Sequence, residues 1–228
     1  MFAVIHVFMD GVTTRYDLGA YLLRAAVLCL LLSAGGFFSP KACGATAIPT
    51  AAKFYRADLT RNARVVMGLD APVSLFAAQI HQESGWRASA RSGVGAQGLA
   101  QFMPATANWI SDLFPELARN DPYNPGWSLR ALVRYDDWLY ARIRAADACQ
   151  RWAMALSAYN GGLGWIGRDQ ARASRLGLDQ LVWFGSVETV NAGRSASNWR
   201  ENRDYPRRII YDRQPLYVAA GWGPGVCL

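Results

Sequence analysis

The fold of this chain is decided by residues 73–104, VSLFAAQIHQESGWRASARSGVGAQGLAQFMP, in which a helix ending in an acid precedes a glycine-rich loop. Val73, Phe76 and Ile80 recur at helical spacing, and Glu83 falls on their face of the helix. Burial and the negative end of the helix dipole both raise the pKa of an acid at this position. We therefore predict a protonated carboxyl group at Glu83. The alternative is a frayed helix end where the acid reaches solvent.

The loop after this helix contains three closely spaced glycines, Gly93, Gly95 and Gly98. Such spacing indicates positive φ angles, or a backbone held close to something else. No Gly-Lys-Ser/Thr follows and no strand pattern precedes, so the loop does not match a phosphate-binding loop. A nucleotide site is therefore not expected.

The rest of the chain reads as helices separated by turns, with no sustained alternation of polar and apolar residues. These patterns predict a mainly α fold with one domain over residues 48–228. Residues 165–197 form a possible surface insertion, and residues 212–228 an irregular tail. Helices are expected at about 50–67, 70–84, 104–113, 128–148, 150–159, 169–175 and 200–211.

The formal net charge is +7 and is carried almost entirely by arginine. A basic balance favours anionic partners such as nucleic acid, anionic lipid or an acidic wall polymer, and selects none of them by itself. Because nothing but charge supports nucleic-acid binding, we rank that function last and expect no nucleic-acid partner.

The N-terminal residues resemble an export signal. Arg15 and Arg24 precede an apolar run at 25–38, and small residues follow around 45–47. The run is short for a membrane span. We predict a signal peptide over residues 1–47, with an uncleaved membrane anchor as the alternative.

Cysteine positions predict one disulfide. Cleavage near residue 47 would remove Cys29 and Cys43 and leave Cys149 and Cys227 in an oxidising compartment. We predict that the remaining two form a bond, with two buried thiols as the alternative. His81 would be the only remaining histidine, so a Ser-His-Asp triad and a zinc site are not expected, and we predict neither metal nor cofactor.

Four short stretches occur in an order that carries a family resemblance: ESGW at 83–86, GAQGLAQFMPATA at 95–107, AYNGG at 158–162 and ENRDY at 201–205. Together they resemble the family 1 lytic transglycosylases, whose catalytic domain has a lysozyme-like fold. The resemblance spans about residues 51–211. Departures from the usual pattern are Ala100, Gly161 and Asn202, which stand where Met or Phe, Ala, and Thr are common.

The resemblance implies cleavage of the bond between N-acetylmuramic acid and N-acetylglucosamine in peptidoglycan without added water, closing a 1,6-anhydro ring. Glu83 matches the single catalytic acid, which would act first as acid and then as base. Peptidoglycan strands would be the substrate, and the protein would be an exported, periplasmic or cell-envelope monomer, with membrane association through its N-terminal segment as an option.

The same resemblance implies roles for further residues around Glu83. It places the Tyr159 hydroxyl near the carboxyl group, and Glu201 matches an acid whose role is structural. A helix-capping role for Gln101 and a core-packing role for Tyr159 are the competing interpretations. The implied substrate-binding residues are Ser84, Gln101, Tyr159, Asn160 and Tyr205.

Two other functions fit the motifs less well. A goose-type-like lysozyme of the same fold would use Glu83 with water, and its products would be heavier by one water. A non-catalytic wall-binding or secretion-apparatus component would keep the fold without the chemistry, but Glu83, Gln101 and Tyr159 are all present.

Overall fold

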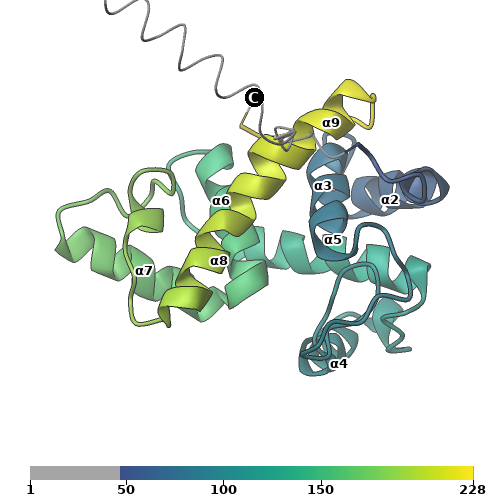
Figure 1. Cartoon of the computed structure of the whole chain (residues 1–228), viewed down its shortest axis with the longest axis horizontal. Helices are drawn as coiled ribbons and strands as arrows, with labels where there is room; N and C mark the ends of the chain where they lie inside the picture. Colours follow the sequence, from purple (N-terminus) through teal and green to yellow (C-terminus); the bar gives the residue numbers. More distant parts are fainter. Residues whose placement is uncertain (1–46, 228) are drawn as a thin grey trace, which may run out of the picture. The chain divides into compact units, whose positions relative to one another are not determined.

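Helices joined by loops make up the part of the chain that the structure, a computed structural model, describes, residues 47–227 (Figure 1). The predicted mainly α fold class is confirmed there, and all these residues fall in one unit. The predicted export signal at 1–47 lies outside the described residues except for its last residue. None of the helices from residue 47 onward has the length and apolar character needed to cross a bilayer.

The α-helices are α2 (Ala52–Met67), α3 (Val73–Ser84), α4 (Pro104–Leu113), α5 (Pro125–Arg142), α6 (Ala148–Gly161), α7 (Leu163–Arg175), α8 (Ala196–Arg207) and α9 (Gln214–Ala219).

Helix α3 is the most enclosed element, packed against α2 and against the C-terminal segment that ends in α9. Its residues from Val73 to Ile80 are all buried. It ends as predicted, because Gly85 adopts the left-handed conformation (φ 59°, ψ 34°) and its N–H bonds to the His81 carbonyl. Its start differs from the prediction: Pro72, not Asp70, directly precedes the helix, and no side chain caps it.

Helices α5 and α6 have different bounds from those predicted. The side chain of Asn124 accepts a hydrogen bond from Trp127 N, so α5 begins three residues earlier than expected. It also ends at Arg142, because Ile143 is extended. The predicted continuation to residue 148 is wrong, since Asp147 caps a new helix by accepting from Gln150 N.

The C-terminal helices follow one another almost without interruption, as the yellow ribbon of Figure 1 shows. Pro206 lies inside α8, and a π-helical segment, Arg208–Arg213, joins α8 to α9. Proline has no N–H to donate, so α8 lacks one backbone hydrogen bond at this position. Helix α8 packs against α6, while the π segment and α9 pack against α3. The C-terminal helices therefore connect elements far apart in the sequence.

Residues 165–197 combine an exposed outer side with side chains that are buried in the domain. Helix α7 already begins at Leu163, so the predicted short helix at 169–175 is its second half. After it, the side chains of Trp183 and Val187 are fully buried, although the chain here lacks long regular elements. Buried Asp169 accepts hydrogen bonds from Arg194 at 2.5 Å and from Arg203 at 2.8 Å. Parts of the possible insertion at 165–197 are therefore integral to the packed domain, while its exposed residues lie at the surface.

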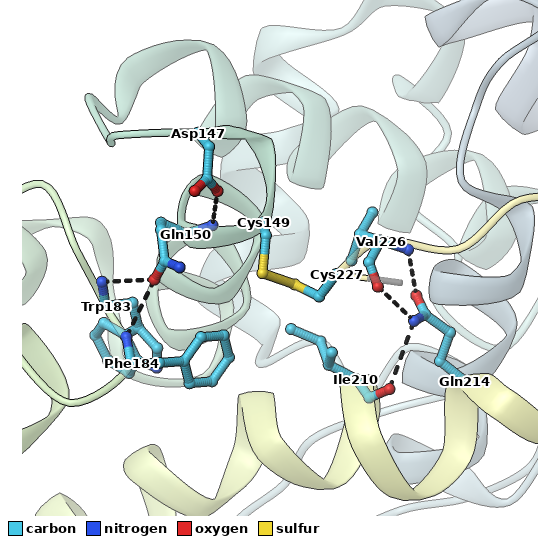
Figure 2. The surroundings of a disulfide bond; sticks show 9 residues. All are labelled: Asp147, Cys149, Gln150, Trp183, Phe184, Ile210, Gln214, Val226 and Cys227. Atoms are coloured by element: carbon cyan, nitrogen blue, oxygen red, sulfur yellow. Dashed lines mark hydrogen bonds between the residues drawn. A yellow bond between two sulfur atoms is a disulfide. The ribbon is translucent and has the colours of Figure 1, made fainter.

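Cys149 and Cys227 form a disulfide in the structure, with a sequence separation of 78 residues (Figure 2). Cys149 lies in the first turn of α6, and Cys227 lies in the irregular tail that follows α9. The prediction of an irregular tail over residues 212–228 was too long, because Gln214–Ala219 form α9 and the irregular part begins at residue 220. Gln214 of α9 fastens the same tail, because its Nε2 donates to Val226 O at 2.8 Å and its Oε1 accepts from Val226 N at 2.9 Å. Figure 2 shows these two attachments on either side of Cys227.

Removing this bond is expected to cost about 2–4 kcal/mol of unfolding free energy, mainly because the unfolded chain regains loop entropy. The test is denaturant unfolding of a Cys149→Ser/Cys227→Ser variant beside the unsubstituted protein, each with and without reductant. Reductant should destabilise only the unsubstituted protein. Equal unfolding midpoints for all four samples would contradict the prediction.

Candidate active site

Glu83 lies at the end of α3, where Tyr205 of α8 donates a hydrogen bond to its Oε1 atom. Glu83 is partly exposed and Tyr205 is buried, so the carboxyl group has one enclosed side and one open side. Because Tyr205 occupies Oε1, the acidic proton is directed to Oε2. The arrangement provides an oriented acid at the edge of the core.

Burial raises the pKa of Glu83 to about 7. Two smaller influences oppose each other: the Tyr205 hydroxyl favours the ionised form, while the nearby charge of Glu201 disfavours it. An acid with a pKa close to neutral is well suited both to give and to take a proton near pH 7.

A second acid near Glu83, Asp136 of α5, is fully buried and was not identified from the sequence. It is 0 % exposed, and its Oδ1 accepts a long bond of 3.4 Å from the Nε2 atom of Gln79, one turn before Glu83 on α3. Burial raises the pKa of Asp136 well above its usual value, and the charge of Glu83 raises it further. Burial therefore favours the protonated form of Asp136, and its complete burial keeps it from substrate.

The sequence did contain a signal for Asp136. Leu132, Asp136 and Leu139 share one face of α5, which is the same pattern of an acid on an apolar face that marked Glu83. The signal was overlooked because Asp136 lies outside the four motif stretches.

Gln101 occupies the last turn of the glycine-rich loop with a left-handed backbone, φ 51°. Its Nε2 donates to the carbonyl oxygens of Gly98 at 2.8 Å and Ala90 at 3.2 Å. Backbone pairing of Gln97 with Arg91 and Phe102 closes the same loop. The amide nitrogen of Gln101 therefore holds the loop together and does not cap a helix.

Tyr159 of α6 reaches the same loop, because its hydroxyl donates to the carbonyl oxygen of Ala100 at 2.8 Å. Burial, with the charge of Glu83 as the next cause, raises the pKa of Tyr159, so the hydroxyl stays protonated. Ala100 N in turn donates to the buried hydroxyl of Ser128 at 3.1 Å. Tyr159 is thus close enough to Glu83 for that charge to affect its pKa, but its hydroxyl proton is used in the hydrogen bond to Ala100 O.

Ser84 and Asn160, the remaining predicted site residues, are placed differently. Ser84 is 1 % exposed and its hydroxyl donates to Ile80 O at 3.4 Å within α3, which favours a packing role. Asn160 is exposed near the end of α6, and its Oδ1 accepts from Nδ2 of buried Asn202 at 2.9 Å. The structure therefore joins Glu83 to Tyr205 directly, Tyr159 and Gln101 to one loop, and Asn160 to Asn202.

Residues 69–182, half of the 228-residue chain, match the family described as the transglycosylase SLT domain. The chain is 26 % identical over 167 residues to the soluble lytic murein transglycosylase of Escherichia coli (strain K12), covering 70 % of this chain and 24 % of that protein. It is 34 % identical over 117 residues to the membrane-bound lytic murein transglycosylase F of Maricaulis maris (strain MCS10), covering 51 % of this chain and 24 % of the relative.

Among solved structures, an inactive mutant of the lytic transglycosylase Slt from Pseudomonas aeruginosa superposes with a TM-score of 0.49 at 23 % identity, over 74 % of this chain and 25 % of that one. The chain spans about a quarter of the length of the two relatives named above. Because the domain match covers half of its residues, the chain belongs to the transglycosylase SLT domain family.

Proposed function

We propose that this chain is a peptidoglycan lytic transglycosylase, which cleaves the β-1,4 bond from N-acetylmuramic acid to N-acetylglucosamine without water and leaves 1,6-anhydromuramic ends. The observation that carries the proposal is the carboxyl group of Glu83, held by Tyr205 with a pKa of about 7. Membership of the family and the similarity to lytic murein transglycosylases support the substrate class.

In the first step, Glu83 donates its proton to the leaving glycosidic oxygen as the bond to the muramic acid C1 breaks. Since Tyr205 bonds to Oε1, the proton comes from Oε2. The carboxylate that forms keeps the Tyr205 bond, which stabilises its negative charge.

In the second step, the Glu83 carboxylate removes the proton of the muramic acid 6-hydroxyl, and that oxygen bonds to C1 of the same sugar. The nucleophile is already part of the substrate, so the reaction gains from proximity and needs no second carboxylate to activate water. Glu83 ends the cycle protonated, as it began.

The test is the mass of the products released from purified peptidoglycan. A transglycosylase gives muropeptides with anhydro ends, lighter by one water than those from a hydrolase. Products with reducing ends only would replace the proposal with a lysozyme-type hydrolase, and absence of any cleavage would support a non-catalytic wall-binding component.

Glu201 is the acid that a hydrolytic mechanism would use beside Glu83. It is exposed on α8, and its charge influences Glu83. A hydrolase would need such a carboxylate to direct water, whereas a transglycosylase does not. Product analysis of a Glu201→Gln variant therefore adds a second test: anhydro products should persist.

We further propose that the protein acts as a monomer in the periplasm or cell envelope, either free after loss of residues 1–47 or held to the membrane by them. The apolar N-terminal run and the envelope location of peptidoglycan support this location. Cell fractionation and N-terminal sequencing test it, and recovery in the cytoplasm with residues 1–47 intact would contradict it.

A further inference from the structure

Asn202 is a buried amide whose hydrogen bonds fix its orientation. It is 1 % exposed, and its Nδ2 donates to Ser157 O at 2.8 Å and to Asn160 Oδ1 at 2.9 Å. Its Oδ1 accepts from the Ser157 hydroxyl at 2.8 Å and from Arg203 Nη1 at 2.7 Å. With both protons and both lone pairs engaged, the amide has only one satisfactory orientation.

This orientation determines which atom Asn160 presents to solvent. Because Asn202 donates to Oδ1 of Asn160, that oxygen is engaged, and the Asn160 Nδ2 makes no hydrogen bond to the described part of the chain. Asn202 and Tyr205 lie three residues apart on one side of α8, so the helix that orients Glu83 through Tyr205 also orients Asn160.

Gly161 provides the space that Asn202 requires. A Cβ atom at this position would lie 2.7 Å from Asn202 Nδ2 and 3.4 Å from its Cγ. Gly161 lies within α6 and has an ordinary helical backbone, which any residue can adopt. A glycine is therefore needed here for the space it leaves to Asn202, and not for its backbone conformation. The glycine at 161 and the asparagine at 202, both departures from the usual family pattern, therefore belong together.

We infer that Asn202 is a positioning residue, which turns the amide of Asn160 so that Nδ2 donates to an acceptor oxygen of the glycan, such as an acetamido carbonyl. Gly161 is the gap that permits this arrangement. Arg203 extends the support, because its Nη2 also donates to Asp169 of α7 at 2.8 Å. Through Arg203, Asp169 of α7 therefore helps to hold Asn202 in its orientation. The inference rests on the proposed function.

The first test is Gly161→Ala, which displaces Asn202 without changing any group that faces the substrate. With a soluble glycan of alternating N-acetylglucosamine and N-acetylmuramic acid, KM should rise about 2–10-fold, as expected for one lost hydrogen bond, with kcat nearly constant. Gly164→Ala is the matched control, since a Cβ there meets nothing within 4 Å. Equal KM values for the two variants would overturn the inference.

A double-substitution cycle separates positioning from general damage. Asn160→Ala should raise KM to a similar extent, and adding Gly161→Ala to it should have no further effect. Additive effects would show that Gly161 acts elsewhere. Asn202→Asp, which removes both amide donors with little change in volume, should reproduce the Gly161→Ala result.

The direction of the Asn160 bond has its own test. Asn160→Asp keeps the shape but offers only acceptors, so it should weaken glycan binding more than Asn160→Ala does. Equal or tighter binding by the aspartate variant would overturn the donor assignment. Binding is measured by calorimetry in the Glu83→Gln background, where no turnover interferes, and cleavage is measured with Glu83 intact. If the protein cleaves the glycan and the Asn160 variants bind it unchanged, the inference alone is rejected. If the protein with no other substitution neither binds nor cleaves the glycan, the proposed function is rejected.

Discussion

Glu83→Gln is expected to lower the rate of peptidoglycan cleavage by at least about a thousandfold while leaving the fold intact. General acid–base catalysis contributes about 10²–10⁴-fold in enzymes, and here one group serves both steps. Glutamine retains the shape and still accepts the Tyr205 hydrogen bond, but it has no proton to donate to the glycosidic oxygen. Cleavage is measured as release of soluble muropeptides. Retained lysis would remove Glu83 from the mechanism.

The pH dependence of the unsubstituted protein provides a second readout of the same assignment. The first step needs protonated Glu83, so activity should fall as the pH rises through about 7. Glu201→Gln removes a negative charge that raises the pKa of Glu83, so the fall should move to lower pH. A profile that does not move would contradict the influence of Glu201.

Glu83→Gln should raise stability above neutral pH even though it abolishes activity. The pKa of Glu83 is higher in the folded than in the unfolded protein, so folding is penalised as the pH rises from the ordinary glutamate pKa to about 7. Glu83→Gln removes this penalty. The variant should therefore have a higher unfolding free energy than the unsubstituted protein at pH 8 and a similar one at pH 4. This comparison also verifies that the inactive variant is folded.

Features set by local chemistry could be predicted from the sequence. The apolar face of α3, its end at Gly85 and the start of α4 at Pro104 depend on residues within one or two turns. The bounds of α5 and α6 could not be predicted as well, because periodicity runs on through residues 143–147. There the capping side chain of Asp147 decides the break, and it was not recognised as a cap.

Contacts between distant segments were predicted only where a motif pointed to them. Tyr205 was expected beside the site, and it does bond to Glu83 across 122 residues of sequence. Asn202 was noted only as a departure from the family pattern. Its pairing with Asn160 depends on the packing of α8 on α6, which no single stretch of sequence specifies.

The three glycines of the glycine-rich loop also show what could be predicted from the sequence and what needed the structure. Positive φ or close approach was predicted for Gly93, Gly95 and Gly98. Gly95 has φ 96° and open space around it, Gly98 has both φ 74° and a close neighbour, and Gly93 has neither. Composition could predict an irregular loop, but only the fold shows which reason applies to Gly95 and to Gly98, and it gives none for Gly93.

Gly98→Ala is expected to lower the unfolding free energy by about 2–5 kcal/mol, the sum of two costs. A left-handed backbone costs a residue with a Cβ about 1–2 kcal/mol, and forcing an atom into a packed region costs about 1–3 kcal/mol. The added Cβ would lie 1.8 Å from Pro122 O, a backbone atom that cannot rotate away. Chemical or thermal denaturation measures the loss.

Gly95→Ala separates the two costs. Its backbone is also left-handed, but a Cβ there meets nothing within 4 Å, so only the strain of about 1–2 kcal/mol remains.

Gly98 also holds the site, because its carbonyl oxygen accepts from the Gln101 side chain at 2.8 Å. Gly98→Ala should therefore reduce cleavage even at temperatures where it remains folded, whereas Gly95→Ala should not. Equal destabilisation by the two variants would mean that the approach of Pro122 to Gly98 does not shape this loop.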